Sequence, residues 1–587
     1  MAIDPTDRPA RTNRSLNNTK VPMPIALRLC AMALLLSLST TIASAQGPSD
    51  DVGTISGSIQ MDAQSYSADS VIGAPNVPEK ILSNTFANLI YTRGKFTAGV
   101  RFESYQGPLL GIDPRYASSG DGTGIGMPYR FARYEDDHAD ITVGNFYEQF
   151  GSGMILRTYE ERNLGFDNSI DGIRARFKPT EGLQLTGFIG RQRTFFDLSE
   201  GIMRGADVNL DLGTLGGGLL ADGMQAQVGA SMVSRFQADQ NDFLKLPENV
   251  TAWSVRSNLL YGGFTLDLEY ASKINDPGAT NLNSFNPGNA LYLATAFAGE
   301  GYGVNLAAKR IDNMDFRSDR TATGNFQTIN FLPALTKQHT WRLITLYPYA
   351  TQPTGEFALQ GDLVFTIPKG SFLGGEETTV NINASMVHGL DTTHVDQYEY
   401  TSEFMWSSDI RDLYYRDINI EVSRKWGKKF KTTMAYVYLD YNQDIVERRA
   451  APRELKYGIV NANFVVLELW YTPTRGHSIR TEFQYMKVGY EEGVKEKSAQ
   501  NGDWVMALVE YAVSPSWYFT VFNEYNYGNE EEALRTHYPN ASIAYTKDAL
   551  RIQGGYGRVR GGILCVGGIC RPVPASNGFT LGMTYTF

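Results

Sequence analysis

The feature that most constrains the fold is a strict alternation of apolar and polar residues that recurs along the chain. In the segment 55–63 (ISGSIQMDA), Ile55, Ile59 and Met61 occupy one face of an extended strand, and Ser58 and Gln60 occupy the other. The same alternation recurs in the segments 96–102, 264–270, 357–367, 379–386 and 579–587. A period of two residues is the period of a β-strand with one apolar and one polar face, so the sequence predicts an all-β protein.

Alternation by itself fits both a soluble β-sandwich and a membrane β-barrel, and the connections favour the barrel. Beyond residue 45 there is no run of eighteen apolar residues, so we expect no membrane-spanning helix. Tight turn signals such as TRGK (92–95) and WGKK (426–429) tend to alternate with polar connections of about ten to forty residues, such as 104–127 and 388–412. Outer-membrane barrels have this asymmetry, with short periplasmic turns and long external loops.

Placing each strand between one short and one long connection gives a single closed antiparallel barrel of about 24 strands, with a range of about 22 to 26. The strand number is least defined at 205–235 and at 312–355. Within 312–355 the alternation of Trp341, Leu343, Thr345 and Tyr347 is strand-like, and we favour an extra hairpin there over infolding or an interface.

The N-terminus has the pattern of a secretory signal peptide over residues 1–45. An apolar run of about fifteen residues (29–43) is followed by Ala-Ser-Ala at 43–45, which is a small-residue cleavage site. Translation starting at Met23 would give this signal an ordinary length. The alternative is an N-terminal membrane anchor, but the run is short for a spanning helix. We therefore expect a mature barrel of residues 46–587, with no plug domain before its first strand.

Two of the three cysteines, Cys565 and Cys570, lie in GGILCVGGICRP, and the third, Cys30, lies within the predicted signal. If Gly567 and Gly568 form a two-residue turn, Val566 pairs with Ile569, and the cysteines face each other at the next, non-hydrogen-bonded position. There Cα atoms approach to about 4.5 Å, which a disulfide accepts. We predict this bridge; a metal site or a redox pair are the alternatives.

Charge and motifs exclude several functions. The net charge is −10 for the whole chain, and −13 for residues 46–587, which hold 48 basic and 61 acidic residues. Basic residues are not clustered, so nucleic acid is not an expected partner. The six histidines are scattered, and nucleotide-binding, metalloprotease and nucleophile-elbow motifs are absent. We expect no cofactor and no metal, and predict that the protein is not an enzyme.

A barrel of this size cannot fill its lumen with wall side chains alone, so the lumen is open, filled by infolded loops, or occupied by a partner. The segment 150–172 is a candidate constriction because Gly151 and Gly153 permit a sharp turn and charges of both signs follow. The predicted constriction residues are Arg157, Glu160, Glu161, Arg162, Asp167 and Asp171. The alternative is an ordinary hydrated external loop together with lumen-facing strand residues.

The last strand ends on an aromatic residue, with apolar residues at alternate positions before it. These residues are Phe579, Leu581, Met583, Tyr585 and Phe587. Together with the alternation and the signal, this ending resembles bacterial outer-membrane β-barrels of the porin-like kind. The resemblance implies lipid around the barrel, recognition of the last strand by the barrel-assembly machinery, and an external position for the last loop. The Cys565–Cys570 bridge would then stiffen an exposed external loop tip. The segment 144–174 is similar to one found in uncharacterised barrel proteins of Bacteroidota, and this similarity implies no activity.

The function that follows from this architecture is passive passage of small polar solutes through an outer-membrane pore. The alternative is a structural or accessory subunit of an outer-membrane assembly, serving secretion or surface attachment, whose lumen is closed by loops or by other envelope proteins.

Overall fold

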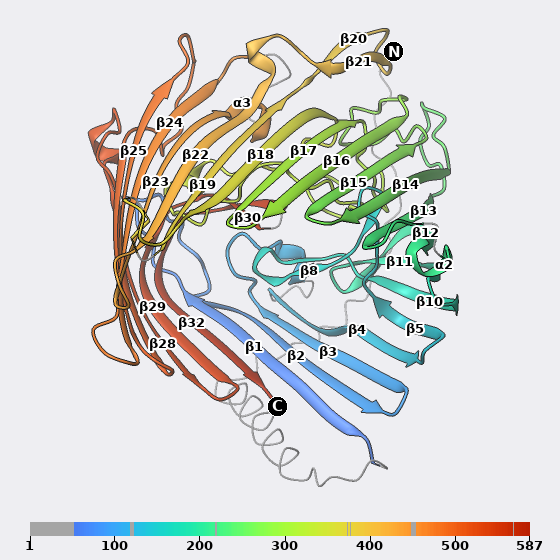
Figure 1. The fold of residues 1–587 in the computed structure, drawn as a ribbon, viewed down its shortest axis with the longest axis horizontal. Helices are drawn as coiled ribbons and strands as arrows, with labels where there is room; N and C mark the ends of the chain where they lie inside the picture. Colours follow the sequence, from blue (N-terminus) through green and yellow to red (C-terminus); the bar gives the residue numbers. More distant parts are fainter. Residues whose placement is uncertain are drawn as a thin grey trace, which may run out of the picture.

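In the computed structural model, a single closed barrel accounts for most of the chain (Figure 1). The structure describes residues 52–117, 122–217, 220–372, 374–375, 377–447, 454–566 and 569–587. The predicted signal peptide lies outside the described residues, and so do Gly567 and Gly568. No helix in the described part of the chain is long and apolar enough to cross a membrane.

The barrel sheet contains 24 antiparallel strands, as the sequence predicted. In order around the barrel they are β1 (Thr54–Ser65), β2 (Ile81–Arg93), β3 (Phe96–Gln106), β4 (Thr123–Glu135), β5 (Ala139–Phe146), β10 (Ile170–Thr180), β11 (Leu183–Thr194), β12 (Asp197–Asp211), β13 (Met224–Phe236), β14 (Asn249–Tyr261), β15 (Phe264–Lys273), β16 (Gly288–Gly299), β17 (Tyr302–Asp312), β18 (Gly355–Ile367), β19 (Glu377–His388), β22 (Leu413–Lys425), β23 (Phe430–Asn442), β24 (Ile459–Tyr471), β25 (His477–Tyr490), β26 (Trp504–Val513), β27 (Trp517–Asn526), β28 (His537–Lys547), β29 (Leu550–Val559) and β32 (Ser576–Thr586).

The barrel closes where the first strand pairs with the last. β1 pairs with β2 on one side and with β32 on the other, with Met61 opposite Met583. The backbone of Phe587 continues this seam, because its N–H donates to Gly57 O at 3.0 Å. Sheet edges are therefore removed, as a membrane barrel requires.

Short turns gather at one end of the barrel and long connections at the other; we call these the turn end and the loop end. The segments 94–95 and 426–429 are typical of the turn end, and 313–354 and 389–412 are typical of the loop end. One neighbourhood departs from the predicted alternation. β11 and β12 are joined at the loop end by Phe195 and Phe196 alone, while β12 and β13 are joined at the turn end through 212–223, which contains α2 (Leu212–Leu215).

The outer face of the wall is an apolar belt. Ile173, Leu306, Val465 and Val521 point outward and are between 51 % and 59 % exposed. Their neighbours along each strand point inward, and Arg174, for example, is buried. Exposed aliphatic side chains on every side of a closed barrel are stabilised by lipid, so this is the surface of a membrane-spanning barrel.

The described connections add small elements that do not join the barrel sheet. They are β6 (Gln149–Phe150), β7 (Leu156–Arg157), β8 (Glu160–Glu161), β9 (Phe166–Asp167), β20 (Leu390–His394), β21 (Tyr400–Trp406), β30 (Gly562–Val566), β31 (Ile569–Val573), α3 (Gln443–Val446) and the 3₁₀ turns Pro114–Tyr116, Arg162–Leu164, Ile344–Leu346, Ile410–Asp412 and Glu532–Leu534. The described residues form no separate plug domain.

The extra hairpin predicted within 312–355 is wrong. The segment between β17 and β18 contains one isolated bridge, Arg317 to Thr328, and a 3₁₀ turn at Ile344–Leu346. Leu343 and Tyr347, which looked like alternate residues of a strand, both pack inward as part of a buried cluster. The segment 205–235 does form strands, because it contains the second half of β12 and nearly all of β13.

Candidate functional site

Three connections from the loop end fold into the barrel and form its candidate functional site. We call 147–169 inner segment A, 313–354 inner segment B, and the β30–β31 pair the disulfide hairpin. Figure 1 shows β8, in inner segment A, and β30 inside the ring of strands. This is the infolding alternative considered for 312–355, and it applies to three connections rather than to one.

Inner segment A packs on the inner wall of β11 to β17. Gly151 and Gly153 have φ of 55° and 99°, and this left-handed backbone turns the chain inward, as the two glycines predicted. Met154, Ile155 and Leu156 follow and are fully buried. They belong to a cluster with wall residues that include Val233, Val250, Ala271 and Ile311. Apolar inward residues on these strands explain why an apolar stretch lies here rather than in water.

Inner segments A and B are joined by main-chain hydrogen bonds. The N–H of Arg157 donates to Ile329 O, and the N–H of Phe331 donates to Gly153 O, both at 2.9 Å. The Asn168 side chain adds a bond from Nδ2 to Thr328 O at 3.0 Å. The two segments therefore form one body inside the lumen, although about 160 residues separate them in the chain.

The second half of inner segment B packs on the opposite part of the wall. Leu343, Ile344 and Tyr347 are buried against inward residues of β22 to β26, among them Leu439 and Phe464, which are fully buried. The inner wall is thus apolar where inner segment B covers it. The alternation of apolar and polar residues could not show this apolar inner wall, because strands such as β24 have apolar residues on both faces at these positions.

Buried charges hold inner segment A to β3 and β11. Arg193 lies 2.5 Å from Glu103 and 2.6 Å from Asp167, measured from guanidinium nitrogen to carboxylate oxygen. Arg101 lies 2.7 Å from Asp167 and also pairs with Glu160. Burial alone raises the pKa of Asp167, but the guanidiniums of Arg193 and Arg101 outweigh it and hold that pKa below its ordinary value.

The six predicted constriction residues are therefore not one ring. Glu160 and Asp167 are neutralised in the buried cluster, and Arg162 pairs with Glu160 at 2.8 Å. The guanidinium of Arg157 stacks on Phe331, with its carbon 4.1 Å from the ring centroid. Glu161 caps the turn that begins at Arg162, accepting the Asn163 N–H at 3.1 Å.

Asp171 lies apart from the other five. It occupies the same face of β10 as Ile173, which is exposed on the outer wall, and it pairs with Arg130 at 3.1 Å. A carboxylate on the outer face does not line the lumen, so the structure removes Asp171 from the predicted constriction. The alternative prediction, a hydrated external loop over 150–172, is also wrong because this segment is largely buried in the lumen.

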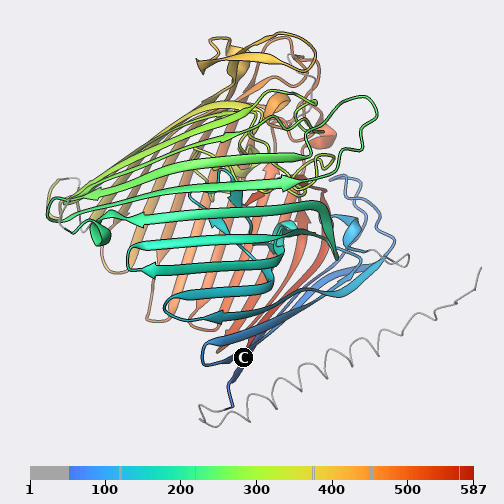
Figure 2. The same cartoon turned by 90° about the vertical axis from the view of Figure 1, so that its right-hand side faces the viewer.

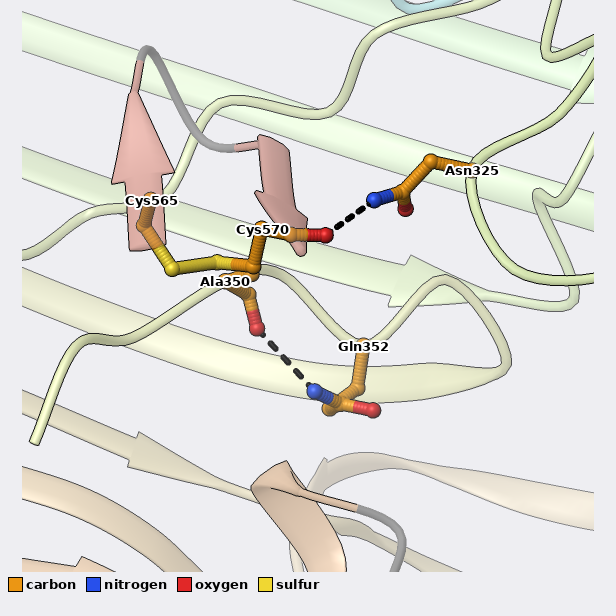
Figure 3. The surroundings of a disulfide bond; sticks show 5 residues. All are labelled: Asn325, Ala350, Gln352, Cys565 and Cys570. Carbon is orange, nitrogen blue, oxygen red and sulfur yellow. Dashed lines mark hydrogen bonds between the residues drawn. A yellow bond between two sulfur atoms is a disulfide. The ribbon is translucent and has the colours of Figure 1, made fainter. Parts of the chain in front are cut away.

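The predicted disulfide between Cys565 and Cys570 is present, with Cα atoms 4.0 Å apart. The predicted register is confirmed, with Val566 opposite Ile569. Its predicted position at an exposed external tip is wrong. The side chain of Asn325, in inner segment B, donates to Cys570 O (Figure 3). Arg571 donates to Asn163 O in inner segment A at 2.7 Å. The hairpin therefore touches both inner segments.

The last strand lies on the seam with its apolar residues on the outer face. Phe579 and Leu581 are 65 % and 43 % exposed, and the rings of Tyr585 and Phe587 stack with centroids 6.0 Å apart. Recognition of this strand by the barrel-assembly machinery stays a prediction.

A cavity of about 490 Å³ opens at the loop end, between the ends of β17, β18, β23 and β24 and the connections beyond them. Most of the residues that line it have polar side chains, although apolar carbon makes up the larger part of the cavity surface. The polar groups are hydroxyls and carboxamides of residues such as Asn313 and Thr354, three tyrosines, and charged groups. The carboxylates are those of Glu399, Asp409, Asp412, Asp444, Glu454 and Glu491. The arginine in the lining is Arg411, which pairs with Asp409 at 2.6 Å.

Several carboxylates in this cavity are held by the backbone rather than by cations. Asp444 accepts the N–H groups of Lys456, Tyr457 and Gly458, each at 2.9 Å. Glu491 accepts the Ile459 N–H at 3.0 Å. Asp409 pairs with Arg411, and Glu454 pairs with Lys495, so carboxylates outnumber cations around the cavity and its electrostatic balance is negative. Sequence reasoning missed this site because its lining comes from six separate stretches of the chain.

Among the described residues, no group of three or more histidine, cysteine, aspartate or glutamate side chains is arranged to hold a metal ion. His388 and His394, the two histidines closest in sequence, lie at the end of β19 and in β20.

A family model described as "Family of unknown function (DUF6029)" matches residues 26–587. No curated protein matches the chain. Among solved structures, the Pseudomonas aeruginosa ferric enterobactin receptor PfeA is 10 % identical with a TM-score of 0.40, covering 91 % of this chain and 80 % of its own. The translocation pore of the P pilus usher PapC is 7 % identical with a TM-score of 0.39, covering 91 % and 98 %. Pseudomonas aeruginosa OpdQ is 9 % identical with a TM-score of 0.31, covering 75 % and 93 %. Similarities this low carry no argument about function.

Proposed function

Since the chain belongs to the DUF6029 family, whose description assigns no activity, we propose a function from geometry: an outer-membrane pore for passive passage of small polar solutes. The observation that carries this proposal is the cavity of about 490 Å³ at the loop end, whose lining presents many polar and charged side chains. A volume in this range accommodates a small molecule, and hydroxyl, amide and carboxylate groups substitute for its hydration shell.

The charges of this cavity give the proposed pore a preference for cations. Six carboxylates and one arginine line the cavity, and two of these carboxylates, Asp444 and Glu491, accept hydrogen bonds from backbone N–H groups. A wall of one sign raises the local concentration of the opposite ion. The direct test is planar-bilayer recording of the purified protein, in which we expect stable conductance with cations carrying most of the current.

The variant for this test is Glu399→Gln with Asp412→Asn, two lining carboxylates of the connection 389–412. We expect the reversal potential in a salt gradient to move toward that of a non-selective pore. The matched control is Glu377→Gln with Asp548→Asn, which also removes two carboxylate charges but at the turn end, where Glu377 pairs with Lys425 and Asp548 lies between β28 and β29. Equal shifts in both variants would show that the cavity does not set selectivity.

We propose a smaller constriction than the six residues predicted from the sequence. It consists of Arg157 and Arg162, whose guanidiniums would face the lumen. Arg157 lies over the rings of Phe331 and Tyr159, and Arg162 lies over Phe86. These positions support the proposal because both guanidiniums belong to partly exposed residues, although Arg162 pairs with Glu160 at the edge of the buried cluster. Replacing either with alanine is expected to change single-channel conductance, and unchanged conductance in both would remove the constriction.

A specific observation also favours the accessory role. Two large apolar clusters fix inner segments A and B to the wall. Burial of apolar surface in this way would allow the chain to close its own lumen. Complete electrical silence of the purified, folded protein would support an accessory subunit of an envelope assembly. Co-purification from native outer membranes would then identify its partner.

A further inference from the structure

The connection 389–412 contains a second hairpin, β20–β21, that lies on the outside of the barrel. Its two strands pair with each other and do not join the barrel sheet. In Figure 2 this yellow-orange hairpin projects beyond the wall at the top of the view. Unlike the connections that fold into the lumen, it is directed toward the surroundings of the barrel.

Contacts with β17 and β18 fix which face of the wall the hairpin covers. Ile311 and Lys309 point into the barrel and are buried, so Arg310 and Asp312 point outward, as does exposed Leu306. Arg310 donates to Ser402 Oγ and to Glu403 O, both at 3.0 Å, and Tyr400 donates to Asp312 Oδ1 at 2.7 Å.

An aromatic contact extends this attachment to the next strand. Phe357 lies between Glu356 and Ala358, both fully buried on the inner face, so Phe357 points outward. Its ring packs on Trp406 with centroids 5.0 Å apart. The hairpin is therefore docked on the outer face of two neighbouring strands.

Arg310 interrupts a row of apolar outward residues. Across the sheet, Tyr270 pairs with Leu291, Leu291 with Arg310, and Arg310 with Phe357. The guanidinium pairs with Asn289 and Asp312 of the wall, but without the hairpin its other N–H groups would meet the lipid boundary without partners, which is costly. The hairpin supplies those partners and continues the apolar row outward, since Phe404 and Met405 are 59 % and 47 % exposed.

We propose that the β20–β21 hairpin is an interfacial membrane anchor whose exposed side chains, Phe404 and Met405, insert into the lipid leaflet next to the loop end. The occupant is lipid because this surface is continuous with the lipid-facing belt of β15 to β18. Aromatic and flexible apolar side chains beside a guanidinium suit the boundary between headgroups and acyl chains. The anchor would also hold in place the cavity wall that includes Thr392 and Tyr400.

Spin-label accessibility in lipid nanodiscs tests this anchor on the full-length protein. The label is placed at Met405→Cys, while native Cys565 and Cys570 stay in their disulfide. Two reference sites bracket the result: Leu306→Cys on the outer wall, 54 % exposed, and Phe243→Cys on the connection 237–248, 95 % exposed. Each variant must first show heat-modifiable migration, which confirms a closed barrel.

We expect the label at Met405 to be relaxed by oxygen more than by a water-soluble nickel complex, with a ratio near that of Leu306 and several-fold above that of Phe243. A ratio equal to that of Phe243 would place the hairpin in water and overturn the anchor. Shielding from both reagents would mean that a protein, or a second copy of the chain, covers the patch, which also overturns it. Neither result depends on whether the barrel conducts.

Discussion

At the scale of single residues, buried ion pairs decide where inner segment A lies. Arg191 and Arg193 have the same parity on β11, yet a register shift between them turns Arg193 inward while Arg191 stays exposed. Arg193 then meets Glu103 and Asp167, which come from positions 90 and 26 residues away. Sequence reasoning found Asp167 as a charged residue of interest but could not find its partners, because a bulge is not visible in an alternation pattern.

Replacing Arg193 with methionine is expected to loosen inner segment A from the wall. Removing one partner of a buried pair leaves uncompensated charge and costs about 3–5 kcal/mol. Hydrogen exchange should then increase in 158–169 with little change in the wall strands. Arg191→Met on the same strand is the control, and equal effects of the two variants would contradict this role for Arg193.

The same cluster predicts sensitivity to acid. The pKa of Asp167 is below its ordinary value of 3.8, so its pairing stabilises the fold fully above about pH 3.8 and is lost as pH falls further, through the lowered value. We expect exchange protection in inner segment A to be constant from neutral pH to about pH 4 and to fall below it. In the Asp167→Asn variant, this loss of exchange protection at low pH should be absent. If the loss is still observed, groups other than Asp167 cause it.

At the scale of elements, the disulfide hairpin is a contact point for both inner segments. Its bonds to Asn325 and Asn163 place it against segments that are far from it in the chain. Arg560, just before β30, adds a bond to Arg342 O at 3.0 Å. The hairpin geometry was predictable because the turn and both cysteines are local in sequence, whereas its inward direction depends on these distant partners.

Replacing Cys565 and Cys570 with serine is expected to destabilise the hairpin by about 2 kcal/mol, from the entropy of the short loop that the bridge closes. The barrel should remain closed, while inner segments A and B gain mobility around Asn163 and Asn325. If the protein conducts, channel noise should increase. Unchanged exchange at both asparagines would show that the bridge does not support the inner segments.

At the scale of the whole molecule, closure depends on close contact along the β1–β32 seam. A Cβ added at Gly57 would lie 2.6 Å from Asn88 O and from the ring of Phe587. At Gly554, on β29, the nearest atom would be Thr580 O at 4.0 Å. A side chain at Gly57 would therefore clash with its neighbours at the seam, whereas a side chain at Gly554 has room.

We expect wild-type protein in detergent to migrate anomalously on gels until boiled, as closed barrels do. Gly57→Val should reduce the heat-modifiable fraction, and Gly554→Val should leave it unchanged. A fully heat-modifiable Gly57→Val would mean that Phe587 moves aside without opening the seam.

The sequence by itself determined the barrel. The period of two, the turn signals and the terminal aromatic strand are patterns that each extend over only a few residues. The strand number and the face on which each side chain lies could therefore be predicted from local sequence. The Cys565–Cys570 register followed for the same reason. Only the tertiary structure decided what fills the lumen, because inner segments A and B are held by apolar surface and charges from strands far away in the chain. The predicted extra hairpin within 312–355 is wrong for this reason. Leu343 and Tyr347 pack on the apolar inner wall of β22 to β26, and that wall forms only when the barrel closes.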